Sequence, residues 1–271
     1  MLVASPPAVV LVTGASSGIG QATARLFAGR GARVFGTSRH QHPGEPGIEM
    51  LQLDVRSEDS VRECTGQVLN RAGTIDVLVN NAGVMLEGFA EETSPAEARA
   101  VFETNLFGAT GVANAVLPHM RAQRSGRIIN VGSLAAWIGE PGEAFYAASK
   151  AALACYTEAL RHEVWHLGIR VSLVEPGPFV TGALRTPVTA RPSIPDYNGP
   201  RENAARTLHD AMRTGGKPQA AAKAIYRAAT ARAPKGRYGT GRGAHTIPRL
   251  RTLVPQRIFD TLLRHGYHLP P

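Results

Sequence analysis

The chain has 271 residues, of which 43% are hydrophobic, enough for the core of one large α/β domain or at most two small ones. Its 2 cysteines, Cys64 and Cys155, form no C-x-x-C pair and no cluster with histidines, which argues against disulfides and zinc and favours a reducing compartment. The sequence shows neither a signal peptide nor an apolar run long enough to span a membrane. We therefore expect a cytoplasmic protein without integral membrane contact and without a metal.

The formal net charge of +9 is concentrated in the C-terminal third, where residues 182–271 hold 16 of the 30 Lys and Arg but 4 of the 21 Asp and Glu. Such asymmetry occurs in proteins that contact nucleic acids, membranes or anionic ligands, and also on ordinary solvated surfaces. Few aromatic residues interleave with these basic residues, so a nucleic-acid partner is not expected. Electrostatic steering of an anionic substrate is an alternative that the charge leaves open.

Apolar runs and amphipathic segments alternate along the first two thirds of the chain. The strand-like runs are 9–14, 32–38, 48–55, 75–83, 126–133 and 169–177, and the helical patterns are 19–31, 57–72, 95–124 and 146–167. Continuous apolar strands that alternate with helices are typical of a parallel sheet covered on both faces. The predicted fold class is α/β: a single-domain Rossmann fold over residues 1–271, with a doubly wound, mostly parallel sheet.

The pattern changes after residue 181. Residues 182–217 are rich in Pro, Gly, Thr and Arg, which predicts a long segment without regular structure and favours a substrate lid. A helix at 218–232, a short strand at 236–241 and a helix at 254–267 are then expected to form a C-terminal extension over 218–271.

The first strand runs directly into T-G-A-S-S-G-I-G at 13–20. Its glycines allow a tight turn and let a phosphate approach the start of the next helix, whose N–H groups and dipole favour a diphosphate. The loop also lies between a first strand and a first helix, which is the context that a dinucleotide site requires. The predicted cofactor-binding residues of this loop are Gly14, Ser16, Ser17, Gly18, Ile19 and Gly20.

The second strand ends at Ser38 and Arg39, where an NAD-selective site usually has a carboxylate. A serine leaves room for a 2′-phosphate, and a guanidinium can pair with that phosphate through two hydrogen bonds. The sequence therefore predicts that NADP(H) is preferred over NAD(H). The alternative is a solvent-exposed arginine at a strand end.

With the glycine loop, N-N-A-G at 80–83, Y-x-x-x-K at 146–150 and P-G at 176–177, the chain closely resembles the short-chain dehydrogenase/reductase family over about residues 8–181. The segment V-E-P-G-P-F-V-T looks most like the steroid- and retinol-dehydrogenase-like branch and its bacterial relatives. The resemblance implies an oxidoreductase that interconverts a ketone or aldehyde and an alcohol by hydride transfer. It also implies a homodimer or homotetramer, built through the two long helices that begin near Asn105 and Tyr146.

The resemblance assigns a role to each matching position. Asn105, Ser133, Tyr146 and Lys150 match the catalytic tetrad. Asp54 and Val55 match the adenine contact, Asn80, Asn81, Ala82 and Gly83 the turn beside the cofactor, and Pro176, Gly177, Phe179 and Thr181 the segment at the nicotinamide.

The four tetrad residues suit carbonyl reduction chemically. A free phenol has a pKa near ~10, and a neighbouring ammonium lowers that pKa. Lys150, one helical turn from Tyr146, is therefore predicted to tune Tyr146 as the general acid or base. Ser133 would orient the substrate oxygen, and Asn105 would hold a water that links Lys150 to solvent.

We expect the substrate pocket to include Trp137, Phe145, Leu184 and Met212, and the substrate to be a lipophilic carbonyl compound. Two alternatives are open. The substrate could be a ketoacyl group carried on an anionic carrier such as CoA. The protein could also be a catalytically silent NADP-binding regulator, since the fold alone does not establish an activity.

Overall fold

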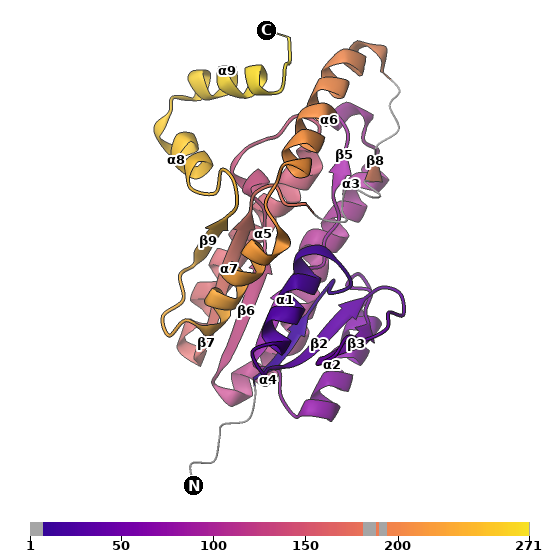
Figure 1. Ribbon diagram of the computed structural model, residues 1–271, viewed down its shortest axis with the longest axis vertical. Helices are drawn as coiled ribbons and strands as arrows, with labels where there is room; N and C mark the ends of the chain where they lie inside the picture. Colours follow the sequence, from indigo (N-terminus) through magenta and orange to yellow (C-terminus); the bar gives the residue numbers. More distant parts are fainter. Residues whose placement is uncertain (1–7, 181–187, 190–193, 271) are drawn as a thin grey trace.

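A computed structural model describes residues 8–180, 188–189 and 194–270 (Figure 1). Its centre is a seven-stranded sheet in the order β3-β2-β1-β4-β6-β7-β9, in which every pairing is parallel. The strands are β1 (Val9–Val12), β2 (Arg33–Ser38), β3 (Ile48–Gln52), β4 (Val77–Asn80), β6 (Gly126–Val131), β7 (Ile169–Pro176) and β9 (Arg237–Thr240). The order reverses between β1 and β4, and such a switch point leaves a crevice at the carboxyl ends of the strands. The predicted Rossmann fold is confirmed.

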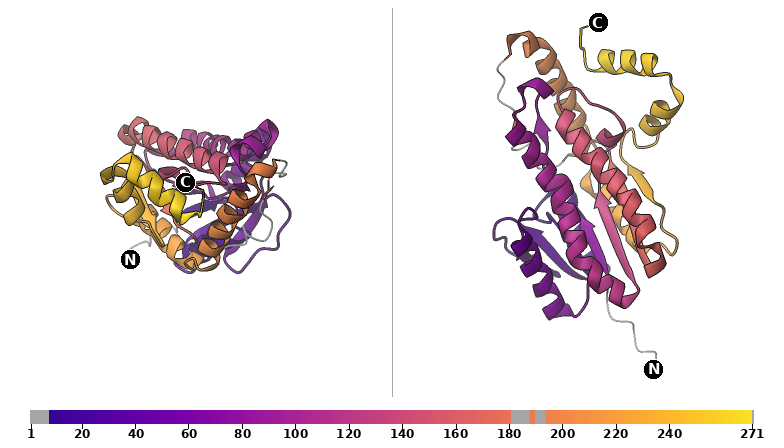
Figure 2. Two further views of the ribbon diagram at one scale, coloured as in Figure 1. Left: turned by 90° about the horizontal axis from the view of Figure 1, so that it is seen from above. Right: turned by 180° about the vertical axis from the view of Figure 1, so that it is seen from behind.

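Helices cover both faces of the sheet, because successive side chains of a strand point to opposite sides. Val10 and Val12 of β1 pack with α1 (Gly18–Ala28) and α7 (Pro218–Thr230), on the face toward the viewer in Figure 1. Val9 and Leu11 pack toward the other face, seen from behind in Figure 2. That face carries α2 (Glu58–Ala72), α4 (Ala109–Gln123) and α5 (Ala144–Glu163).

The predicted helix at 95–124 is divided in the structure. It consists of α3 (Pro95–Phe102), a π-helical turn (Glu103–Gly108) and α4. Single π-helical turns inside helices often occur at functional sites. This one carries Asn105, so the irregular turn falls on a predicted catalytic residue.

The prediction that residues 182–217 lack regular structure is wrong for their second half. Asn198–Arg213 forms helix α6, preceded by the short turn Pro195–Tyr197. Pro200 lies in the first turn of α6, where a missing N–H costs little, so the proline and glycine content concealed the helix. A short strand, β8 (Val188–Thr189), pairs with β5 (Leu86–Glu87). Thr181 and Leu184 lie outside the described residues.

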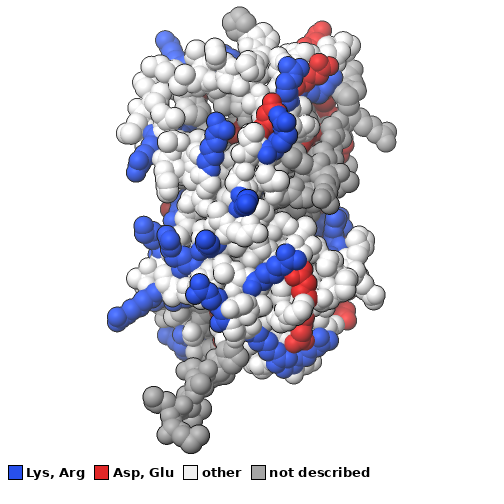
Figure 3. Space-filling view, viewed as in Figure 1, with Lys and Arg blue, Asp and Glu red and all other residues white. Residues whose placement is uncertain are grey.

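The C-terminal extension contains the predicted helix, strand and helix as α7, β9 and α9 (Gln256–Gly266), with one further helix, α8 (Thr246–Leu253). Helix α9 lies beyond the carboxyl end of the sheet (Figure 1). None of the helices in the described ranges has the length and apolarity that crossing a bilayer requires. Basic side chains are scattered over the face shown in Figure 3 and do not gather in one patch.

A buried polar network joins the sheet to the helices behind it. Asn80 Nδ2 donates to Ala109 O at 2.9 Å and to Asn130 Oδ1 at 3.0 Å. Asn130 Nδ2 in turn donates to Thr157 Oγ1 at 2.9 Å, on α5. The chain of bonds fixes β4, β6, α4 and α5 relative to one another, and a buried donor that loses its acceptor is costly.

Replacing Thr157 by Val keeps the shape of the side chain but leaves Asn130 Nδ2 without its acceptor. We expect the free energy of unfolding, measured by urea denaturation, to fall by about 1–3 kcal/mol. Thr230→Val is the matched control. Both threonines donate a hydrogen bond to the carbonyl four residues earlier, but Thr157 is buried and Thr230 is exposed. The control should change stability by less than about 0.5 kcal/mol. Equal losses in both variants would contradict the structural role of the network.

Candidate active site

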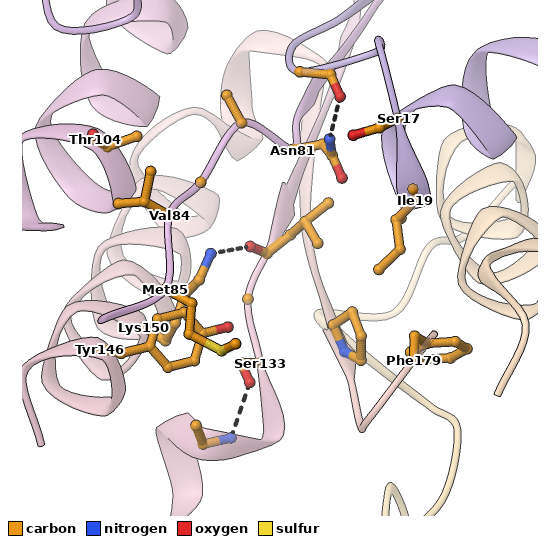
Figure 4. A pocket seen from close by; sticks show the side chains of 18 of the residues that line it. Ser17, Ile19, Asn81, Val84, Met85, Thr104, Ser133, Tyr146, Lys150 and Phe179 are labelled. Carbon is orange, nitrogen blue, oxygen red and sulfur yellow. Dashed lines mark hydrogen bonds between the residues drawn. The ribbon is translucent and has the colours of Figure 1, made fainter. Parts of the chain in front are cut away.

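A cavity of about 550 Å³ lies at the carboxyl ends of β1, β4, β6 and β7, at the switch point of the sheet. Figure 4 shows its central part, with Ser17 and Ile19 on one side and Ser133, Tyr146 and Lys150 on the other. The predicted cofactor residues that line it are Gly14, Ser16, Ser17, Gly18, Ile19, Ser38, Arg39, Asp54, Val55, Asn81, Ala82, Gly83, Tyr146, Lys150, Pro176, Gly177 and Phe179. The structure therefore brings residues from most of the chain into one site.

The glycine loop leaves the start of α1 open to an anion. Gly14 and Gly18 have φ values of +65° and +56°, which residues other than glycine rarely adopt. Ser17 makes no side-chain cap bond to α1, and the first turn of the helix holds no acidic residue. The free N–H groups and the helix dipole therefore fit the diphosphate of a dinucleotide.

Gly20 does not line this cavity. A Cβ at this position would lie 2.2 Å from Gly14 O and 2.4 Å from Asn81 Nδ2. The third glycine thus lets α1 pack closely on the loop, and its predicted contact with a cofactor stays a prediction.

The glycine loop is tied to the N-N-A-G turn by Thr13. Its hydroxyl oxygen accepts from Asn81 N at 3.0 Å and from Ala82 N at 2.9 Å. Asn81 Nδ2 donates back to Thr13 O at 2.9 Å and to Gly14 O at 3.1 Å. Asn80 faces the core and joins the sheet to α4, whereas Asn81 faces the glycine loop and holds it in place.

The adenine end of the cavity is lined by Ser38, Arg39, Asp54 and Arg56. Arg56 Nη2 lies 2.6 Å from Asp54 Oδ2, and this bond lowers the pKa of Asp54 to about 2. Asp54 is thus ionised, and its charge is balanced by Arg56. The charge of Arg39 also lowers the pKa of Asp54, but the Arg39 guanidinium makes no ion pair with a described residue. Arg56 was missed by sequence reasoning, although its place two residues after Asp54 was a usable signal.

Lys150 lies on α5, one turn after Tyr146, and is 5% exposed. Its Nζ donates to Val131 O at 3.0 Å and lies 5.9 Å from the centre of the Tyr146 ring. Burial lowers the pKa of Lys150 to about 8. The ammonium therefore loses its charge at a pH not far above neutrality.

Asn105 is buried and uses its whole amide group. Oδ1 accepts from Val84 N at 2.8 Å, and Nδ2 donates to Val84 O at 2.9 Å and to Ser149 Oγ at 3.0 Å. Asn105 thereby ties the π-helical turn to α5. A Cβ added to Gly83 would lie 3.1 Å from Asn105 Oδ1 and 3.4 Å from Lys150 Nζ, so both groups converge there. The water that Asn105 was expected to hold stays a prediction.

The predicted lowering of the Tyr146 pKa is wrong for this structure. The pKa of Tyr146 is raised, chiefly by burial and then by the negative charge of Glu143, with a smaller effect of Glu140. A hydrogen bond from Ser133 acts in the opposite direction. Burial is thus the main cause of the raised pKa and the two glutamates add to it, while the Lys150 ammonium, which is directed at a backbone carbonyl, does not reverse it. Tyr146 is thus a neutral phenol that can donate a proton.

The end of the cavity beside Tyr146, which we call the substrate end, has other lining residues than most of those predicted. Met212 lines it, together with Leu208 and Ala211 from the same face of α6. Trp137 and Phe145 do not line this cavity. Trp137 instead donates to Glu175 Oε1 at 2.8 Å and stacks under Arg237, an arrangement that local sequence does not reveal.

Sequence reasoning missed three ionisable residues at this end: Glu140, Glu143 and Tyr267. The two glutamates precede Tyr146 by six and three residues, so their spacing could have drawn attention to them. Tyr267 follows α9, and nothing in the sequence links it to residues so far away along the chain.

A diphosphate-binding loop at the switch point of a Rossmann sheet, with a tyrosine, a lysine and a serine at the far end of the same cavity, defines a nicotinamide-dependent oxidoreductase. Comparison with known proteins agrees. Residues 8–191 match the family model of the short chain dehydrogenases. A 3-ketodihydrosphingosine reductase of Bacteroides thetaiotaomicron is 40% identical over 199 residues, which are 73% of this chain and 72% of the relative. The 3-oxoacyl-[acyl-carrier-protein] reductase FabG of Vibrio cholerae is 38% identical over 176 residues, 62% of this chain and 72% of the relative.

Solved structures agree as well. A short-chain dehydrogenase from Streptomyces avermitilis has a TM-score of 0.81 at 32% identity, over 97% of this chain and 95% of that chain. A short-chain dehydrogenase/reductase from Burkholderia phymatum, in complex with NAD, has a TM-score of 0.76 at 26% identity over 95% of both chains. A serine dehydrogenase complexed with NADP+ has a TM-score of 0.73 at 28% identity, over 85% of this chain and 93% of that chain. The chain belongs to the short-chain dehydrogenase/reductase family. Its likeness to the steroid and retinol branch stays a prediction.

Titration of Lys150 should limit the reaction at alkaline pH. We expect kcat/KM for the reduced cofactor, which reports groups of the free enzyme, to fall as pH rises through about 8 because the ammonium is lost. In Lys150→Arg the charge persists, so the profile of whatever activity remains should lack this fall. A wild-type profile that stays flat to about pH 10 would contradict the assignment.

Proposed function

We propose that the protein reduces a lipophilic ketone with NADPH, and oxidises the corresponding alcohol in the reverse direction, with Tyr146 as the general acid or base. The observation that carries the proposal is the convergence of Ser133, Tyr146 and Lys150 on one cavity that also holds the glycine loop. The apolar side chains of Met85, Leu208 and Met212 at the substrate end favour a lipophilic compound. Both named relatives are reductases of keto compounds, which supports the reaction class.

The residues of the site divide the work of carbonyl reduction. A reduced nicotinamide, when bound, supplies the hydride to the carbonyl carbon. The phenol of Tyr146 donates its proton to the oxygen as negative charge develops there. Ser133 Oγ accepts from Ala135 N at 3.1 Å, and its hydroxyl proton, which bonds Tyr146 in this structure, would turn to the substrate oxygen when a ketone binds. Lys150 stabilises the resulting tyrosinate as long as the lysine itself is protonated.

The state of Tyr146 favours reduction over oxidation. A tyrosine with a raised pKa keeps its proton at neutral pH and is a ready acid but a poor base. Oxidation of an alcohol needs the tyrosinate, so added positive charge at the site would have to lower this pKa first.

The preference for NADP(H) rests on the adenine end of the cavity. Arg39 is available to pair with a 2′-phosphate, and Ser38 leaves room for it. Asp54, the carboxylate in this part of the described lining, is already neutralised by Arg56. Since related structures contain NAD or NADP+, the family alone does not decide the cofactor.

A ketoacyl group on an acidic carrier is the second candidate substrate. The similarity to a carrier-protein reductase and the basic C-terminal third favour it. A screen of lipophilic ketones and of ketoacyl thioesters, each with NADPH and NADH, separates the two candidates.

Replacing Tyr146 by Phe removes the proton donor. We expect kcat/KM for the ketone to fall by about 10²–10⁴-fold, while NADPH binding, measured by fluorescence, persists. Tyr156→Phe is the matched control: Tyr156 lies on the same helix, its hydroxyl has no hydrogen-bond partner among the described residues, and it does not line the cavity. Undiminished turnover in Tyr146→Phe would refute the assignment of Tyr146 as the proton donor.

Replacing Arg39 by Ala tests the cofactor preference. A charge-assisted pair with the 2′-phosphate is worth roughly 1.5–3 kcal/mol, so kcat/KM for NADPH should fall by about 10–100-fold and that for NADH should change little. Arg62→Ala is the control, since Arg62 is exposed on α2 and pairs with Asp59. An equal loss with both cofactors, or none, would overturn the role of Arg39.

A further inference from the structure

Glu143 occupies an unusual position for a buried carboxylate. It is the N-cap residue of α5 and is 2% exposed, yet its side chain makes no cap bond to the helix. Glutamate is not among the favoured N-cap residues, because short side chains fit that position better. The side chain of Glu143 instead lines the cavity and meets the carboxyl group of Glu140, and its Oε1 receives no hydrogen bond from an N–H or hydroxyl donor of the described residues. A buried polar atom without a partner is costly and points to a missing ligand.

Glu140 brings a second carboxylate to the same place. Both glutamates belong to one tight turn, in which Glu143 N donates to Glu140 O at 3.1 Å and Gly142 has a φ of +84°. Tyr267, which follows α9, hydrogen-bonds the Glu140 carboxyl group and lines the cavity beside it. Glu87 adds further negative charge beside Glu143, while its own carboxylate lies 2.9 Å from His209 Nε2.

No cation from the described residues balances this pair. The basic residues of the cavity lining are Arg39 and Arg56 at the adenine end and Lys150, whose ammonium is directed at Val131 O. The pKa values of Glu140 and Glu143 are both raised by burial, and Glu140 raises that of Glu143 further. The same charge raises the pKa of Tyr146, so the pair affects the proton donor directly.

We propose that Glu140 and Glu143, together with Tyr267, form a subsite for a protonated amine of the substrate, so that the ketone class the protein reduces is a lipophilic amino ketone. The proposal rests on the proposed function and adds its substrate class. Glu143 is the N-cap of α5 and Tyr146 lies in its first turn, both line the cavity, and the charge of Glu143 acts on Tyr146 directly. The ammonium therefore belongs on a carbon close to the reacting carbonyl.

An ammonium suits this subsite better than a metal ion or an uncharged polar group. It offers three donors to carboxylate oxygens, and charge-assisted bonds of this kind are stronger than neutral ones. A metal site would need more ligands, and no group of three or more His, Cys, Asp or Glu residues in the described ranges is arranged to hold a metal. A bound ammonium would also offset the negative charge beside Tyr146.

Turnover of matched substrates tests the proposal. The probes are 2-aminododecan-3-one, prepared fresh as its hydrochloride, and 2-methyldodecan-3-one, in which a methyl group replaces the amine. We expect the wild-type enzyme to prefer the amino ketone by about 10-fold or more in kcat/KM. Glu143→Gln should reduce this ratio to near one, and Glu140→Gln should lower it. Glu63→Gln, on the exposed surface of α2, should leave the ratio and the activity unchanged.

An equal rate with both ketones in the wild type would overturn the amine subsite and leave the proposed ketone reductase intact. Reduction of neither probe would count against the proposed function, and the subsite is then judged by binding alone. For this purpose octylamine and octan-1-ol are titrated into the wild-type protein with NADP(H) by calorimetry. The amine should bind about 10-fold more tightly and, because both carboxyl groups have raised pKa values, release protons, seen as a dependence on the buffer's ionisation heat. Equal affinities for amine and alcohol would refute the subsite.

Discussion

The site depends on how one face of α5 is docked against the carboxyl end of the sheet. Glu143, Tyr146 and Lys150 follow one another at helical spacing and line the same cavity. Three buried bonds hold the helix there: Asn105 to Ser149, Lys150 to Val131 and Asn130 to Thr157. Two of them involve residues of the π-helical turn or the tetrad. Two residues of the predicted tetrad, Asn105 and Lys150, therefore also hold α5 in its position.

The same docking creates an electrostatic problem. A buried ammonium and a buried carboxylate lie on either side of Tyr146, and each is displaced from its ordinary pKa by loss of water. Neither compensates for the other, because Lys150 points to a backbone carbonyl and Glu143 into the cavity. The pKa of the Tyr146 phenol between them is raised chiefly by burial and then by the negative charge of Glu143. Such perturbed groups in a cleft are typical of functional sites, where ligands complete the charge balance.

Much of the fold and site could be predicted from the sequence because the signals are local. Buried strands in a parallel sheet are apolar throughout, and the glycine loop needs its residues at fixed spacing between a strand and a helix. What failed depends on contacts between distant segments. Trp137 does not line the cavity, because its indole donates to Glu175 and its ring packs against Arg237. Tyr267, which follows the last helix, does line the cavity. The pKa of Tyr146 is raised by burial and by Glu143, and a prediction that considered Tyr146 and Lys150 alone could not include either cause.

The positive net charge of the protein and its acidic subsite do not conflict. Exposed charges separated by more than about 8 Å are largely screened at physiological ionic strength, so the scattered arginines of the C-terminal third act weakly on a buried ligand. Charges on buried groups are screened much less, and Glu140 and Glu143 are the acidic groups at the substrate end of the cavity. An anionic carrier would meet the basic exterior with its phosphates while its keto group stayed uncharged. The buried glutamates thus act on substrate groups beside the reacting carbonyl, and the basic surface acts on the part of a ligand that stays outside the cavity.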